Sequence, residues 1–432
     1  NKRIPKQPMK RILSFYFLFF FLLPILSYSQ GTNLSLGNEF ISSLLVEKNY
    51  VQAYSFFDES VKSKISEPLL KETVEKLEMQ LGKFKSVIET TNENETYLYY
   101  ADFEKFKLDI RIAFNEKSKI IGFFFVPHKE FKKQPSLGKE YTIMSNGIDL
   151  KGTLLIPESG NLKKLVLFVH GSGPNDRDET VFENKPFKDI AESLFANGIA
   201  SYRFDKRTYT NPESFSDKST IDDEVTNDIL NIVKYFKSDS QFSDYEIIVL
   251  GHSLGAFVLP RIATRSNQIS KIILLAGNAR PLDVLIQEQF DYLYTLNPSN
   301  EMKAEREKIS HQIENLHSKS FNLTTSKDNL PLGLSAPYWK SILDYKPLKD
   351  IQKVNIPTLI VQGERDYQVT MKDFELWKSG VQHNKKAKCI SYPGLNHLFM
   401  TGTSPSTPQE YSIKGTVDTK VIKDIKDFVV AE

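Results

Sequence analysis

Short apolar runs alternate with amphipathic segments through most of the second part of this 432-residue chain, and this alternation constrains the fold more than any other feature. Each run is too short for a helix and too continuously apolar for a strand with one face in water. Strands of that kind are buried on both faces, as in a parallel sheet covered by helices. The sequence therefore predicts a doubly wound α/β sheet, with strands at 165–169, 199–204, 247–250, 272–276, 356–361 and 389–392 and helices at about 186–197, 221–237, 254–265, 371–379 and 418–430.

The predicted sheet opens with an antiparallel pair. Asn146-Gly147 separates two strand-like segments at 141–144 and 150–156. An Asn-Gly turn matches the right-handed twist of two antiparallel strands and is a strong hairpin signal. We therefore expect a single α/β domain over residues 139–431.

One insertion interrupts the alternation between the strands that end at Ala276 and begin at Ile356. Its segments 282–296 and 303–316 have helical periodicity and carry many charges. These residues predict a helical cap, at about 281–345, over the carboxyl edge of the sheet.

A second, smaller domain is expected at residues 34–128. Apolar residues at helical spacing predict two helices within 37–81, and Ser66 with Pro68 marks the start of the second. From Phe84 the apolar period changes to two, which predicts about four strands at 84–91, 95–103, 107–114 and 119–126. Helices followed by a meandering sheet indicate a small α+β domain.

The residues before this domain have the parts of a secretory leader. Lys10 and Arg11 precede an apolar run at 12–26 that ends in small and polar residues, including Ser27 and Ser29. The run is shorter than the roughly 20 residues that span a bilayer. We predict a signal peptide at 9–29, cleaved after Ser29, and a periplasmic or extracellular protein with no stable membrane insertion. An uncleaved N-terminal anchor is the alternative.

Composition and motifs exclude several classes of function. The 56 basic and 54 acidic residues leave a net charge of +2, and no basic stripe interleaved with aromatic residues suggests a nucleic-acid partner. Neither a metal-ligand cluster nor a dinucleotide fingerprint is found, so no cofactor is expected. The single cysteine, Cys389, rules out an intramolecular disulfide, and its strand-like surroundings predict a buried, inert thiol.

The main chemical motif is Gly251-His252-Ser253-Leu254-Gly255, which follows a predicted strand and opens a predicted helix. A serine on so tight a turn needs small neighbours, and its hydroxyl projects above the sheet. We predict that Ser253 is the nucleophile.

A serine nucleophile needs a general base that follows it in the chain and lies at the same sheet edge. His397 comes just after the last predicted strand, in a turn-rich loop at the carboxyl edge. His383 precedes that strand and so belongs at the opposite edge. His397 is therefore the predicted base.

The acid that orients the base is expected after the strand at 356–361. Glu364 and Asp366 are both available there, and Asp366 lies deeper in the loop, with better reach toward His397. We predict Asp366 and keep Glu364 as the minor alternative.

Two backbone amides should bind the oxyanion formed during acyl transfer. The Leu254 amide, next after the nucleophile, is one. The other is assigned to Ser172, with Gly171 close behind, in the glycine-rich loop after the strand at 165–169. His170 and His252 are expected to be packing or supporting residues.

With these motifs in place, residues 139–431 resemble the α/β-hydrolase superfamily, in its branch of exported esterases and serine-aminopeptidase-like hydrolases. Residues 34–128 resemble a small domain of unknown function, of cystatin-like or nuclear-transport-factor-like shape, that often precedes such hydrolases. The resemblance implies an acyl-enzyme mechanism on esters. It rests on 170–173, 202–207, 251–255, 280–282, 288–289, 362–369 and 394–397.

These observations favour a serine hydrolase of the carboxylesterase kind acting on short-acyl esters, carried by small molecules or polymers. An aminopeptidase or amidase on the same triad is the first alternative, and it would need a cap carboxylate such as Glu288, Asp291 or Glu301 to hold the substrate's amine. The second alternative is a non-catalytic binding scaffold, which has no physical need of an intact triad.

Overall fold

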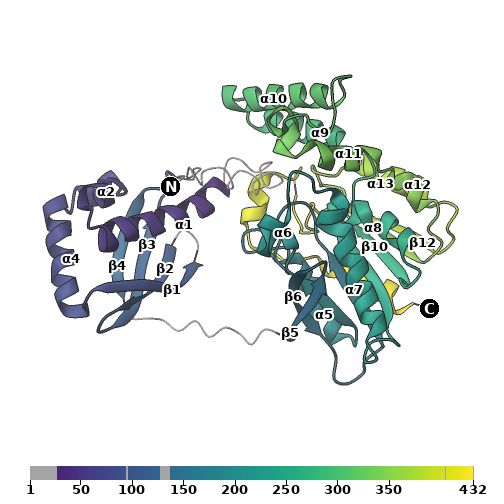
Figure 1. Ribbon diagram of the computed structural model, residues 1–432, viewed down its shortest axis with the longest axis horizontal. Coiled ribbons are helices and arrows are strands. Elements are labelled where there is room, and N and C mark those ends of the chain that lie inside the picture. Colours follow the sequence, from purple (N-terminus) through teal and green to yellow (C-terminus); the bar gives the residue numbers. More distant parts are fainter. Residues whose placement is uncertain (1–26, 94–95, 127–136, 404, 432) are drawn as a thin grey trace, which may run out of the picture. The chain divides into compact units, whose positions relative to one another are not determined.

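The computed structural model describes residues 27–93, 96–126, 137–403 and 405–431 (Figure 1). The chain divides into two compact units, with the boundary between Ser136 and Leu137. The predicted signal peptide at 9–29 lies almost wholly outside the described residues, as do residues 127–136 between the units. None of the helices in the described ranges combines the length and apolar character needed to cross a bilayer.

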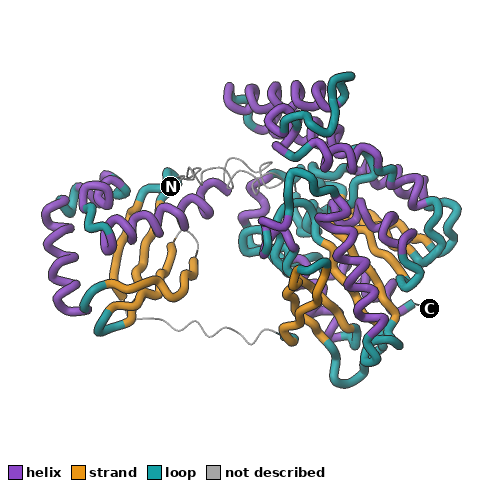
Figure 2. Tube along the Cα trace, in the orientation of Figure 1, coloured by secondary structure: helices purple, strands orange, loops and turns teal. Residues whose placement is uncertain are grey.

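The first unit packs helices against one face of an antiparallel meander, in the order β1-β2-β3-β4 (Figure 2). Its core is largely aromatic and aliphatic and includes Phe40, Phe57, Tyr99 and Ile110. The elements are α1 (Ser27–Ile41), η2 (Ser42–Val46), α2 (Tyr50–Ser55), α3 (Glu59–Lys62), α4 (Glu67–Leu81), β1 (Phe84–Glu93), β2 (Thr96–Phe103), β3 (Lys107–Phe114) and β4 (Ile120–Val126).

The helical part of this unit differs from the prediction of two helices. The N-terminal stretch is broken because Lys48 takes a left-handed φ of 54° and the side chain of Asn49 caps the start of α2. A further break comes at Asp58, which caps α3. The start predicted at Ser66 and Pro68 is confirmed, since Ser66 is the N-cap of α4.

The second unit contains an eight-stranded sheet in the order β12-β11-β10-β9-β7-β8-β6-β5. Strands β7 to β12 are parallel to one another, whereas β6 is antiparallel to its neighbour β8 and forms with β5 the antiparallel hairpin predicted at Asn146-Gly147. The strands are β5 (Lys139–Ser145), β6 (Ile148–Leu155), β7 (Lys164–Val169), β8 (Ala200–Phe204), β9 (Glu246–His252), β10 (Lys271–Leu275), β11 (Thr358–Gly363) and β12 (Ala387–Tyr392).

Helices cover both faces of this sheet, as the doubly wound prediction requires. Helices α5 and α14 share one apolar cluster with the central strands, and α8 packs against both α7 and α12 (Figure 1). The helices of the sheet region are α5 (Pro186–Ala196), α6 (Arg207–Thr210), α7 (Asn227–Ser238), α8 (Leu254–Arg265), α12 (Pro347–Ile351), α13 (Met371–Gly380) and α14 (Thr419–Val430), with short helical turns η3 (Pro212–Ser214), η4 (Asp222–Thr226) and η7 (Pro408–Ser412).

The insertion between β10 and β11 is helical, as predicted. It consists of α9 (Leu282–Leu296), α10 (Asn300–Leu316), η5 (Lys327–Asn329), η6 (Pro331–Gly333) and α11 (Ala336–Asp344), and it lies beyond one edge of the sheet (Figure 1). Cys389 is only half-buried, because β12 is an edge strand, and burial raises the pKa of its thiol. The prediction of a buried thiol is therefore wrong, although a thiol with a raised pKa is a poor nucleophile.

Candidate active site

The site lies where the parallel strands end. Because β7, β9, β10, β11 and β12 all run in the same direction, the loops that follow them meet at the carboxyl edge of the sheet. Every residue of the predicted site belongs to one of these loops or to the start of α8.

Ser253 forms the turn between β9 and α8. Its φ of 52° and ψ of −117° lie in a region that a non-glycine residue occupies only when its surroundings enforce it. A Cβ atom at Gly251 would lie 2.6 Å from the carbonyl carbon of Gly255, and one at Gly255 would lie 2.1 Å from the carbonyl oxygen of Val169. Both glycines are therefore needed for the turn that presents the serine.

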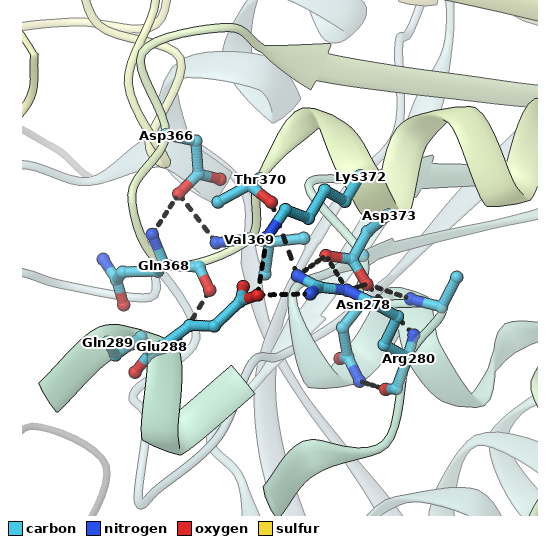
Figure 3. Close-up of polar contacts among 12 residues, drawn as sticks. Asn278, Arg280, Glu288, Gln289, Asp366, Gln368, Val369, Thr370, Lys372 and Asp373 are labelled. Carbon is cyan, nitrogen blue, oxygen red and sulfur yellow. Dashed lines mark hydrogen bonds and ion pairs between the residues drawn. The ribbon is translucent and has the colours of Figure 1, made fainter. Parts of the chain in front are cut away.

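His397 and Asp366 lie together at this edge. Nδ1 of His397 is 2.6 Å from Oδ2 of Asp366, and both side chains are buried. Oδ1 of Asp366 also accepts hydrogen bonds from the backbone amides of Gln368 and Val369, at 2.8 and 3.0 Å (Figure 3). The Gln362 side chain donates to Oδ2 at 3.0 Å. The carboxylate is thus held from several directions while it faces the imidazole.

The two alternative residues have other partners. The exposed Glu364 accepts a hydrogen bond from Ser391 Oγ at 2.7 Å. The exposed His383 has its Nε2 atom 3.3 Å from the carbonyl oxygen of Val354. Neither of them makes a contact of the Asp366–His397 kind.

His252 connects the nucleophile turn to His397. The His252 Nε2–H donates to the carbonyl oxygen of His397 at 2.9 Å, and the two ring centroids are 4.6 Å apart. In the described part of the chain, the Ser253 hydroxyl forms no hydrogen bond with His397. Such bonds are often long without substrate and tighten in the complex, so the arrangement is compatible with a nucleophile and its base.

The oxyanion loop, residues 170–174 after β7, lies beside the nucleophile. A Cβ atom at Gly171 would be 3.2 Å from Cβ of Ser253. The amide of Gly171 already donates to Oε1 of Glu179 at 2.5 Å, which favours the Ser172 amide over the Gly171 amide as the second oxyanion donor. The Ser172 amide is therefore the remaining donor of that pair. Leu254 is the first residue of α8, where a helix leaves its amides without intrahelical partners.

Glu179 links the oxyanion loop to His252. Its Oε2 atom is 3.0 Å from His252 Nδ1 in a buried ion pair. Burial disfavours the charged form of each residue, but the partner's charge outweighs it, so the pKa of His252 is raised and that of Glu179 is lowered. His170 packs against Phe187 and Phe204, and burial lowers its pKa to about 4, so it is a neutral packing residue at pH 7.

The carbonyl groups of the oxyanion loop are held by two side chains. Asn175 Nδ2 donates to the carbonyl oxygens of Gly171, Ser172 and Gly173, at 3.2, 3.0 and 3.3 Å. Lys206 Nζ donates to those of Gly171 and Gly173, at 2.9 and 3.0 Å. The loop is therefore fixed on the side of its carbonyl groups.

Sequence reasoning missed these supporting residues. Glu179 and Asn175 lie in the polar run after the oxyanion loop, which contains no recognisable motif. Lys206 lies in the segment 202–207 that carries the family resemblance, yet nothing in the sequence says what its ammonium group contacts. Its contacts depend on the loop after β7 and the strand β8 meeting in space.

The cap is tied to the acid loop, residues 364–370 after β11. Gln289 of α9 donates from its side chain to the carbonyl oxygen of Gln368 at 2.8 Å (Figure 3). Arg280 pairs with both Asp373 and Glu288, each at 2.8 Å. A cavity of about 670 Å³ is lined by α9, by the acid loop, and by Pro393, Gly394, Gly402, Thr403 and Pro405.

The cap carboxylates proposed for amine binding are mostly neutralised. Glu288 accepts from Arg280 and from Lys372, both at 2.8 Å, and Asp291 pairs with Arg306. Glu301 is exposed at the start of α10. The structure therefore offers no buried, unpaired cap carboxylate among these three residues. The described residues also contain no cluster of His, Cys, Asp and Glu that could hold a metal ion.

Comparisons with known proteins agree with this architecture. Residues 160–403 match the family described as serine aminopeptidase, S33, and residues 38–123 match a family of unknown function, DUF3887. The esterase EstD of Thermotoga maritima is 32% identical over 399 residues, which cover 89% of this chain and 93% of EstD.

A second curated protein is a more distant relative. A monoglyceride lipase homolog of Monkeypox virus is 24% identical over 241 residues, 54% of this chain and 82% of that protein. Among solved structures, Est1E from Butyrivibrio proteoclasticus covers 68% of this chain and 99% of its own, with 18% identity and a TM-score of 0.44.

Proposed function

Because this chain belongs to the serine aminopeptidase (S33) family of α/β-hydrolases, we propose that it hydrolyses carboxylic esters through an acyl-enzyme on Ser253. The observation that carries the proposal is the buried Asp366–His397 contact of 2.6 Å at the same sheet edge as the strained Ser253 turn. A serine turn, a base and an acid in that arrangement constitute the machinery of acyl transfer.

Each residue of the site has a defined role in the proposed reaction. Ser253 Oγ attacks the ester carbonyl carbon and gives its proton to Nε2 of His397, while Asp366 stabilises the imidazolium. The amides of Leu254 and Ser172 bind the oxyanion. His397 then protonates the leaving alkoxide, and a water molecule that His397 deprotonates releases the acid and regenerates Ser253.

The choice of ester over peptide substrates has two supports. The relative that is 32% identical over most of both chains is named as an esterase. The cap carboxylates Glu288 and Asp291, which an aminopeptidase would need for a substrate's amine, are already paired with basic side chains. A paired carboxylate gives up its partner before it can bind an ammonium group, and this weakens the attraction.

Substitution Ser253→Ala tests the proposal directly. We expect a fluorophosphonate probe to label the native protein and not the variant, and kcat on p-nitrophenyl acetate to fall by about 10⁴-fold or more. Ser238→Ala, at the end of α7, is the matched control and should keep full labelling. We expect acetate and butyrate esters to be turned over faster than the octanoate.

Other outcomes point to the alternatives. Cleavage of an aminoacyl-anilide in preference to esters would favour the aminopeptidase. Absence of both labelling and turnover in the folded native protein would favour a binding scaffold.

We also propose that the protein is exported. The support is the basic and apolar leader of residues 9–29 described above. Fractionation of an expressing cell and N-terminal sequencing of the product would test it: a mature chain beginning at Gln30 is expected, and cytoplasmic, unprocessed protein would contradict it.

A further inference from the structure

Lys206 is a buried cation aimed at the oxyanion loop. Its side chain is 2% exposed, and its ammonium group donates to the carbonyl oxygens of Gly171 and Gly173. The third partner is the carboxylate of Glu224, which lies on the short π-helical turn η4 before α7. A buried ammonium group is costly unless it is paired and fully hydrogen-bonded, and here it is both.

Glu224 in turn contacts the cap. Its Oε2 atom accepts a hydrogen bond from the hydroxyl of Tyr338 on α11, and both side chains are buried. Burial, with the carboxylate beside it, keeps the pKa of Tyr338 well above its usual value, so the tyrosine remains a donor. A second bond joins the same elements, because the Ile221 amide donates to Ser341 Oγ at 3.1 Å. The described contacts therefore run without a gap from the cap to the oxyanion loop.

The planar peptide unit explains how these contacts orient the Ser172 amide. The carbonyl of Gly171 and the amide of Ser172 belong to one planar unit, and the described residues contain no cis peptide bond. In a trans unit the C=O and N–H bonds point in opposite directions. When Lys206 and Asn175 hold the Gly171 carbonyl, they therefore direct the Ser172 amide away from themselves. That amide is the proposed oxyanion donor.

We propose that Lys206 is a positioning residue for the oxyanion hole, and that the buried contacts Tyr338–Glu224–Lys206 make the position of cap helix α11 part of the oxyanion-hole geometry. The proposal rests on the function proposed above and deepens it. A substrate that displaces α11 would weaken stabilisation of the oxyanion, and one that fits beneath it would keep the donor in place.

Substitution Lys206→Met tests the first half. We expect kcat to fall by about 10- to 100-fold, less than or equal to the loss of a whole oxyanion donor. KM should stay within about twofold, because the oxyanion exists only after attack on the ester. The dissociation constant of an alkylboronic acid, which forms a tetrahedral adduct on the serine, should rise by a similar factor.

Lys206→Met alone leaves Glu224 as an unpaired buried carboxylate, so a second variant separates that effect from the loss of the ammonium group. In Lys206→Met/Glu224→Gln both charges are gone, so stability should recover relative to the single variant, while kcat should stay low. The matched control is Lys271→Met. Lys271 is also buried and donates to backbone carbonyls, but those belong to the end of α14. That variant should lose thermal stability and keep kcat.

Substitution Tyr338→Phe tests the link to the cap. We expect kcat to fall by roughly 3- to 10-fold, as for one hydrogen bond, and the effect to be non-additive with Lys206→Met. Tyr245→Phe is the control: it removes a buried hydroxyl that bonds Asn161 at 2.7 Å, at the opposite end of β9. It should leave kcat unchanged.

Two results would contradict this proposal and leave the proposed ester hydrolysis unaffected. If folded Lys206→Met and its double variant keep native kcat and boronate affinity, Lys206 does not position the donor. If Tyr338→Phe and Lys206→Met are simply additive, the cap is not coupled through this chain. Failure of the proposed function itself would show in the native protein, as missing Ser253-dependent labelling.

Discussion

The oxyanion loop and the acid loop meet at one sheet edge but are held by different chemistry. Around the oxyanion loop two of the supporting groups are buried charges, the ammonium of Lys206 and the carboxylate of Glu179, beside the neutral amide of Asn175. Around Asp366 the donors other than His397 are neutral: two backbone amides and the amide of Gln362. The catalytic charge on that side is the carboxylate itself.

The difference follows from what each loop must hold. Asp366 is a charged group that neutral N–H donors can orient, because hydrogen bonds to a charged acceptor are strong. The Ser172 amide is neutral and must be aimed indirectly, through its peptide plane, so one charged partner, Lys206, is placed on the carbonyl side. Removing one of a pair of buried charges is costly, whereas removing one neutral donor costs about 1 kcal/mol. The oxyanion side should therefore be the more sensitive to changes in its supporting residues.

The largest effect is expected on the acid side, when its one catalytic charge is removed. Asp366→Asn keeps the shape but no longer stabilises the imidazolium, and kcat should fall by about 10⁴-fold with little change in KM. Steady-state kinetics on p-nitrophenyl butyrate would measure it. Glu364→Gln, two residues away and exposed, is the control and should be near native. Loss of activity in the control instead would make Glu364 the acid.

A smaller effect, on stability, is expected on the oxyanion side in acid. The pKa of His170 is about 4 in the folded protein against an ordinary 6.5, so the unfolded chain binds a proton that the folded chain does not. Above pH 6.5 the neutral His170 contributes in full to the free energy of unfolding. As the pH falls toward 4, the free energy of unfolding decreases by up to about 3 kcal/mol.

His170→Phe, which keeps an aromatic ring between Phe187 and Phe204, should reduce this loss. Urea unfolding of both proteins at a series of pH values and constant ionic strength would compare them. Parallel curves for the variant and the native protein would show that His170 is not the source of the acid sensitivity.

The smallest effect is expected where the cap meets the acid loop. Gln289→Leu removes one neutral hydrogen bond, to the carbonyl oxygen of Gln368, and should lower kcat by about fivefold or less. Measuring kcat of Gln289→Leu and of Lys206→Met under the same conditions compares the two loops directly. A loss from Gln289→Leu as large as that from Lys206→Met would mean that the cap acts mainly through the acid loop.

Much of the fold could be predicted from sequence because buried parallel strands and amphipathic helices have distinct periods. The helix predicted at 254–265 has the bounds of α8, and the hairpin at Asn146-Gly147 formed as expected. The helices of the first unit were harder, because Lys48 breaks the helix with a backbone conformation that no residue type announces there. The half-buried state of Cys389 depends on β12 being at the edge of the sheet, which is a matter of strand order.

For the site, the sequence by itself determined which residue types follow which strands, and hence the nucleophile turn and the candidates for acid and base. The loops that follow parallel strands lie at one edge of the sheet, and the parallel direction of the strands can be inferred from their alternation with helices. Only the tertiary structure decided that the Gly171 amide is taken by Glu179, that Asp366 rather than Glu364 contacts His397, and that Lys206 reaches the oxyanion loop. Those choices depend on the directions of single N–H, C=O and carboxylate groups, which are set by packing between segments far apart in the chain.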